Sequence, residues 1–201
     1  MTEVKEGATG DIAAIADALV SAFSDDPVML HIFRKPNGRD KRMRALFVSE
    51  AKRSLEKGAL HTTSVGAAQG GAIWMGPDQW RTGGLELLSQ IPLLFAMGLG
   101  CTPRALSVLG KMEKIHPEEP HWYLAVLGTA KDHQGKGVGS ALISPVLEKC
   151  DAEGVPAYLE SSKESNIPFY NRHGFEVTGE VKVKDGPSLW PMWREPRPPE
   201  S

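Results

Sequence analysis

The residues best suited to chemistry lie in a glycine-rich segment, His133–Ser140, which reads His-Gln-Gly-Lys-Gly-Val-Gly-Ser. Gly135, Gly137 and Gly139 have no Cβ atom, so the backbone there can come close to a ligand. The segment follows a strand-like apolar run, Trp122–Leu127, and leads into a helix-like run. The first N–H groups of a helix have no intrahelical partner and lie at the positive end of its dipole. This arrangement predicts a site for a phosphorylated cofactor.

Two known phosphate loops fit this segment poorly. A P-loop needs Gly five residues before its Gly-Lys pair and Ser or Thr after it, but Ala130 and Gly137 occupy these positions. A dinucleotide loop needs its last Gly one place later than Gly139, and it lies directly against its strand. Glu160 does fall about where a ribose-binding acid would lie, so an NAD-dependent reductase remains an alternative.

A third pattern fits. The spacing Gln134-x-x-Gly137-x-Gly139 resembles the coenzyme A pyrophosphate loop of the GNAT (Gcn5-related N-acetyltransferase) superfamily. The segment Asn166–Phe175 resembles the second signature of that superfamily. The stretch 118–195 is similar, more narrowly, to puromycin N-acetyltransferases, and it covers about two fifths of the chain.

The resemblance implies an α/β fold of GNAT type, a single domain in which a mixed, splayed β-sheet is flanked by helices. It also implies acetyl-CoA as co-substrate, with pantetheine between two separated parallel strands. Leu127, Gly128 and Thr129 would bind pantetheine through their backbone, and the residues of the glycine-rich loop would hold the pyrophosphate. The implied cofactor-binding residues are Leu127, Gly128, Thr129, Gln134, Gly135, Lys136, Gly137, Val138, Gly139, Ser140 and Asn166.

Acetyl transfer from a thioester also needs a proton donor for the departing thiolate. Tyr170 matches the general-acid tyrosine of the family, and a phenol with an ordinary pKa of about 10 is protonated at neutral pH. The structural alternative is that Tyr170 packs with Phe169 and Phe175 in the core. Asn166 could likewise be a helix N-cap instead of a pantetheine ligand.

Several residues are candidates for the general base. Glu113, on the helix that precedes the central strand, is the first candidate, and His116, Glu119 and His121 are rivals. Each of them could instead be solvated surface. His116 and His121 do not have the spacing of a helical metal pair, so no metal is expected.

Composition indicates one domain, residues 1–195, with a flexible tail at 196–201. The chain has 201 residues, 41% hydrophobic and 24% charged, with a net charge of −2. This charge gives no indication of binding to nucleic acid or to an anionic membrane. No apolar signal core is present at the N-terminus, and the apolar stretch Ile91–Cys101 is too short for a bilayer span. We therefore expect a cytoplasmic protein, without a disulfide between Cys101 and Cys150.

Apolar periodicity predicts the elements. The segment 174–183 is interpreted as one strand, and the chain is expected to fray from Arg194. Pro145 is expected to kink its helix. The strand–helix–strand order after residue 120 predicts a parallel pair with one crossover helix. Helices are expected at 9–23, 39–55, 84–90, 103–115, 138–150 and 166–173, and strands at 59–65, 70–75, 122–127, 156–160, 174–183 and 188–194.

The resemblance further implies that the acceptor is a primary amine on a small molecule, either a puromycin-like aminoacyl nucleoside or another amine. The apolar segment 85–109, with Trp74, Trp80 and Phe95, could form the wall of a pocket for an aromatic amine. The same segment could instead be core or a homodimer contact. A coenzyme A-binding sensor without turnover is a further alternative.

Overall fold

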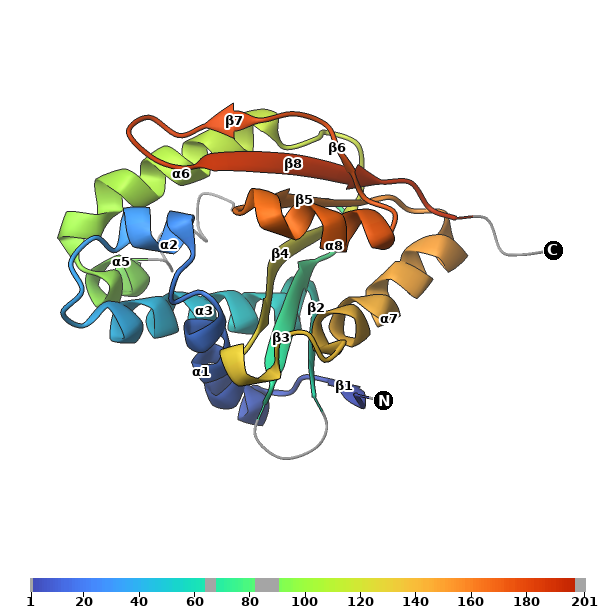
Figure 1. The fold of residues 1–201 in the computed structure, drawn as a ribbon, viewed down its shortest axis with the longest axis horizontal. Coiled ribbons are helices and arrows are strands. Elements are labelled where there is room, and N and C mark those ends of the chain that lie inside the picture. Colours follow the sequence, from blue (N-terminus) through green and yellow to red (C-terminus); the bar gives the residue numbers. More distant parts are fainter. Residues whose placement is uncertain (1, 64–67, 82–90, 198–201) are drawn as a thin grey trace.

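The computed structural model describes residues 2–63, 68–81 and 91–197, and shows a mixed sheet flanked by helices (Figure 1). The helix expected at 84–90 and the last two residues of the strand expected at 59–65 lie outside the described residues. The strands are β1 (Val4–Glu6), β2 (Gly58–Thr63), β3 (Gly70–Met75), β4 (Trp122–Thr129), β5 (Ala157–Ser161), β6 (Glu176–Val177), β7 (Val181–Lys182) and β8 (Ser188–Arg194). The α-helices are α1 (Ile12–Ala22), α2 (Pro27–Ile32), α3 (Arg39–Lys57), α5 (Ile91–Met97), α6 (Thr102–Ile115), α7 (Val138–Glu153) and α8 (Ile167–Arg172). Short 3-10 turns are η1 (Thr9–Asp11), η2 (Leu99–Cys101), η3 (Lys131–His133) and η4 (Glu164–Asn166).

The sheet runs in the order β1-β2-β3-β4-β5-β8-β6, and β7 also pairs with β8. β4 and β5 are parallel, as predicted, and α7 is the crossover helix between them. Their register contains only two pairs, Trp122 with Ala157 and Tyr123 with Tyr158. Beyond Tyr123 the two strands separate, so one edge of β4 has no strand beside it among the described residues. We call this gap the opening.

Each face of the sheet has its own core. On one face, α1 and α3 pack against side chains such as Leu60 and Ile73. On the other face, α7 and α8 cover alternate residues of the same strands, including Trp74 and Leu159. Side chains alternate between the two faces along each strand. The opening between β4 and β5 can therefore be reached by side chains from both layers.

The helix ends near the opening follow local rules. Asp26 precedes α2 and its side chain accepts hydrogen bonds from the backbone N–H groups of Val28, at 2.9 Å, and Met29, at 3.0 Å. α7 begins after Gly137 and ends before Gly154, which have left-handed φ angles of 80° and 67°. α7 continues across Pro145 from Val138 to Glu153. Proline removes one backbone donor there but does not end the helix.

Two expectations for the C-terminal region are wrong. The segment 174–183 forms two short strands, because the third residue in register, Thr178, faces Pro191, which has no N–H to donate. Arg194 does not fray: its side chain is only 3% exposed and pairs with Asp151 at 2.7 Å. The order extends to Arg197, whose backbone N–H donates to the Asp151 carboxylate.

No single described helix is long and apolar enough to span a membrane. Residues Ile91–Met97 (α5) and Leu99–Ile115 (η2 and α6) are together long and apolar enough for a span, but the axes of the two segments meet at 91°. Phe95 and Leu99 on this bent pair are 67% and 64% exposed.

Buried histidines should make the fold sensitive to mild acid. Burial is the main cause that lowers the pKa of each of these side chains below the ordinary 6.5: His31, His61, His121 and His173. Each therefore binds a proton more readily in the unfolded chain, and the free energy of unfolding should fall as pH drops through 6.5. We expect a lower melting temperature at about pH 5.5 than at about pH 7.5, measured by circular dichroism at constant ionic strength.

The aspartates should not cause a fall in the free energy of unfolding over the pH range in which these histidines bind protons. Asp11, Asp25 and Asp151 have a pKa below the ordinary 3.8, so they act at lower pH. Asp26 has a raised pKa because it is buried, and its protonation at acid pH favours the folded state. His61→Gln should reduce the fall in melting temperature, since His61 is 6% exposed. A melting temperature that is flat between the two pH values would contradict the prediction.

Candidate active site

The glycine-rich loop has the geometry expected of an anion-binding helix start. Gly135 and Gly137 have φ angles of 73° and 80°, and nothing lies within 4 Å of a Cβ added to either. Gly137 precedes α7, and no side chain caps the first N–H groups of the helix. The uncapped N–H groups at the N-terminus of α7, a sixteen-residue helix, provide hydrogen-bond donors and positive potential for an anion.

Other residues of the loop have structural contacts. Lys136 donates through Nζ to the Asp132 carbonyl at 2.8 Å and is exposed. A Cβ on Gly139 would lie 3.3 Å from the Phe169 ring, so this glycine brings α7 close to α8. Ser140 Oγ lies 2.9 Å from His173 Nε2, a second link between these helices. Val138, in contrast, is buried in the core.

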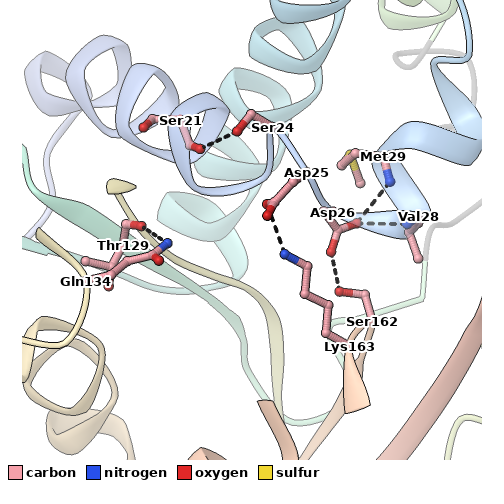
Figure 2. A network of polar contacts seen from close by, with 10 residues as sticks. All are labelled: Ser21, Ser24, Asp25, Asp26, Val28, Met29, Thr129, Gln134, Ser162 and Lys163. Carbon is pink, nitrogen blue, oxygen red and sulfur yellow. Dashed lines mark hydrogen bonds and ion pairs between the residues drawn. The ribbon is translucent and has the colours of Figure 1, made fainter. Parts of the chain in front are cut away.

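The free edge of β4 leads from the opening to this loop. Ala130 donates its N–H to Gln69 on the β3 side. Because backbone groups of alternate strand residues point to opposite sides, Gly128 also faces β3, whereas Leu127 and Thr129 face the free edge. The Thr129 carbonyl accepts a hydrogen bond from Gln134 Nε2 at 3.1 Å (Figure 2).

Gly128 therefore differs from its neighbours. A Cβ there would lie 2.7 Å from Leu19 and 2.9 Å from Phe23, so the glycine allows α1 to pack on β4. β4 also has a bulge: Val126 pairs with Ile73 and Leu124 with Trp74, so the residue between, Ala125, has no partner on β3. The bulge lies where β4 separates from β5.

Tyr170 comes to the opening from α8. Its ring packs against Phe169 and Phe175, with centroids 5.1 and 6.0 Å away, and the residue is 8% exposed. Burial, and secondly the charge of Asp26, raises the pKa of Tyr170, so the phenol is protonated throughout the neutral range. The packing role and a role as hydrogen-bond donor are therefore compatible.

Asp26 belongs to a polar network that connects the α1–α2 turn with the end of β5 (Figure 2). Ser162 donates its hydroxyl to the Asp26 carboxylate, and Lys163 pairs with Asp25 at 2.9 Å. We call these four residues the latch. The local signal for Asp26 is its N-cap position directly before Pro27 at the start of α2.

Comparison with known proteins places this geometry in a family. A profile described as "Acetyltransferase (GNAT) domain" matches residues 110–195. An uncharacterized N-acetyltransferase of Schizosaccharomyces pombe is 33% identical over 181 residues, which cover 82% of this chain and 70% of that protein. The chain belongs to the GNAT family.

Solved structures of acetyltransferases have a similar fold. A Corynebacterium glutamicum structure described as histone acetyltransferase HPA2 and related acetyltransferase is 29% identical, with a TM-score of 0.70 and full coverage of both chains. Arylalkylamine N-acetyltransferase 2 of Aedes aegypti has a TM-score of 0.68 at 12% identity, over 97% of this chain and 99% of its own. The predicted GNAT fold is thus confirmed, and this protein is an acetyl-CoA-dependent acyltransferase.

Membership in the GNAT family removes the reductase alternative, and the structure gives a reason. The Glu160 side chain is 1% exposed and lies 3.7 Å from His116, on the α6 side of the sheet. The loop leads into α7 on the opposite face, so Glu160 does not face a ribose bound there. Asn166 is exposed, and although it directly precedes α8 its side chain makes no cap hydrogen bond.

The base candidates separate into two groups. Glu113 is exposed on α6 and Glu119 is exposed on the following loop. His116 and His121 are 9% and 1% exposed, so their interpretation as solvated surface is wrong. Their Nε2 atoms lie 3.0 Å apart. The pair is buried because α6 carries His116 onto the sheet next to β4, a contact that local sequence does not reveal.

The structure separates the two interpretations of the aromatic residues, as pocket wall or as core. Trp74 is fully buried within the α7 layer, and Phe95 lies on the surface. Trp80 stacks on His116 with ring centroids 3.6 Å apart. The three aromatic residues therefore do not line a common surface. No group of three metal-ligating side chains occurs within residues 2–63, 68–81 and 91–197.

Proposed function

We propose that this GNAT protein transfers the acetyl group of acetyl-CoA to a primary amine of a small molecule. The observation that carries the proposal is the unpaired edge of β4 beyond Tyr123, together with the uncapped start of α7 that follows β4 in the chain. Leu127 and Thr129 have backbone groups on this edge, and amides of a pantetheine arm can pair with an unpaired strand.

The pyrophosphate would be held by backbone N–H groups from Gly135 to Ser140, and acetyl-CoA supplies the activated thioester. The Thr129 carbonyl is already used by Gln134, so Gln134 would position the strand end beside the loop. Lys136 would complement charge once released from the Asp132 carbonyl. Gly128 would serve by close packing on α1, and Asn166 would reach the arm only from the exposed end of α8.

The chain's own residues suit direct attack. The bulge at Ala125 lies where β4 separates from β5, and a backbone N–H there would stabilise an oxyanion. Tyr170 is held protonated, so it would act as hydrogen-bond donor to the departing thiolate. The raised pKa makes full proton transfer less favourable, and stabilisation of the developing charge is the larger part of its role.

The acceptor is proposed to be either a puromycin-like aminoacyl nucleoside or another small amine. A net charge of −2 without a long acidic run gives no sign of a docking surface for basic protein tails. The test is coenzyme A release with puromycin, other amine antibiotics, polyamines and peptide N-termini. We expect the highest kcat/KM with a small amine. A higher kcat/KM for peptide amines would overturn the acceptor class, and no release with any amine would indicate the alternative, a coenzyme A-binding sensor.

A further inference from the structure

A buried polar cluster on the α6 side of the sheet is not used by the steps described above. It consists of His116, His121 and Glu160, enclosed by aromatic rings. His121 is 1% exposed, and the side chains of His116 and Glu160 are 3% and 1% exposed. The enclosing aromatic residues are Trp80, Tyr123, Tyr158 and Trp193. Buried ionisable groups are costly, so such a cluster needs a physical explanation.

Its hydrogen bonds determine where the protons lie. His121 Nδ1 lies 2.5 Å from the Glu119 carbonyl, which can only accept, so Nδ1 carries a proton. In neutral His121 the Nε2 atom is then an acceptor, and it lies 3.0 Å from His116 Nε2, which must donate. Burial lowers the pKa of His121, which keeps this ring neutral.

The same logic reaches Glu160. With its proton on Nε2, neutral His116 presents an acceptor at Nδ1, and this atom lies 3.7 Å from Glu160 Oε1. Two acceptors therefore face each other whenever Glu160 is ionised. The two lone pairs repel each other, and a proton bound to either His116 Nδ1 or Glu160 Oε1 would replace this repulsion with a hydrogen bond.

The position of Glu160 relates this contact to the reaction. The last parallel pair is Tyr123 with Tyr158, so Glu160 lies two residues into the opening, opposite the bulged Ala125. Its side chain points to the α6 face, whereas Leu159 beside it belongs to the layer that contains Tyr170. Glu160 and Tyr170 thus come to the opening from opposite faces.

We propose that Glu160 and His116 together are the general base of this enzyme, with His121 as the residue that positions His116. The inference rests on the proposed N-acetyltransferase function. An N–H bond of the acceptor's ammonium group breaks, and its proton is bound between Glu160 Oε1 and His116 Nδ1, directly or through one water. The electron pair stays on nitrogen, which becomes a neutral amine. The proton returns to solvent after turnover.

The other groups around the pair should not titrate in the same range. Burial first, then the charge and hydrogen bonding of Glu160, raises the pKa of the Tyr123 and Tyr158 phenols, so both stay protonated. Glu50 on α3 acts on Tyr123, and Asp78 acts on His121, as negative charges. Both carboxylates favour retention of protons in the cluster.

The kinetic test compares Glu160→Gln with wild type across pH. We expect kcat/KM to fall about 10²-fold or more near neutral pH with unchanged acetyl-CoA affinity. The loss should shrink as pH approaches the acceptor's own pKa, because the amine is then already neutral. Glu164→Gln, the same change at an exposed residue of η4, should leave kcat/KM unchanged. A loss of equal size at every pH would show a structural role and overturn the proposal, as would no loss at neutral pH.

A second measurement does not depend on turnover. In selectively labelled wild type, the ring nitrogens of His116 and the carboxyl carbon of Glu160 should change in a single step with pH, because they share one proton. His121 should show a proton on Nδ1. Independent titration of the two groups would overturn the pair. Single-step titration in a protein that acetylates no amine would leave the pair standing and reject the proposed function. If Glu160→Gln does not fold, His116→Asn replaces it in the kinetic test.

Discussion

Tyr170→Phe should lower kcat by roughly 10²-fold or more while acetyl-CoA affinity stays nearly the same. The phenylalanine ring keeps the packing against Phe169 and Phe175, so the variant removes only the hydroxyl donor. Without it, the developing thiolate loses a hydrogen bond inside a buried site, where such bonds are strong. Rapid-quench or steady-state thiol release gives kcat, and calorimetry gives the affinity.

The unfolding midpoint of this variant is its control. The phenol hydroxyl of Tyr170 lies near the Asp26 carboxylate. We expect the unfolding midpoint of Tyr170→Phe to differ from that of wild type only by the small amount typical of the loss of one hydroxyl group. An unchanged kcat with the best acceptor would remove Tyr170 from the mechanism. Its packing in the α7 layer would then be its entire role.

Gly137→Val should abolish measurable acetyl-CoA binding. A valine at a φ of 80° is strained, and its side chain would occupy the open space in front of the first N–H groups of α7. Gly154→Val is a matched control, because Gly154 has a φ of 67° and equally open surroundings at the opposite end of the same helix.

Both valine variants should lose comparable stability, roughly 1–2 kcal/mol from the left-handed backbone. Only Gly137→Val should lose the ligand, as measured by calorimetry with acetyl-CoA. Equal affinity in the two variants would show that the pyrophosphate is held elsewhere.

The parts of this site that could be predicted from sequence are those encoded locally. The loop glycines, the start of α7 and the parallel pair of β4 and β5 follow from residues close together in the chain. The boundary of α3 at Gly58 follows in the same way. In each case a short pattern of apolar spacing and glycine determines backbone geometry.

The missed parts depend on contacts between distant segments. The hydrogen bond of Ser162 to Asp26 joins residues 136 positions apart. The interpretation of His116 as solvated surface is wrong because Trp80 and Tyr158, which are distant in the chain, enclose it. For Trp74 the sequence leaves both a pocket wall and the core open, and its position in β3 buries it in the core. No local pattern contains this information, since it arises only when the layers pack.

The two-residue pairing between β4 and β5 has a consequence for the protein without its ligand. An unpaired strand is ordinarily a hazard at the rim of a sheet, where other chains can add to it. Here the unpaired stretch lies in the middle of the sheet, between α1 on one side and the latch and α8 on the other. Because helices cover both faces of the sheet around this stretch, the enzyme can keep backbone groups ready for pairing and still resist aggregation through them.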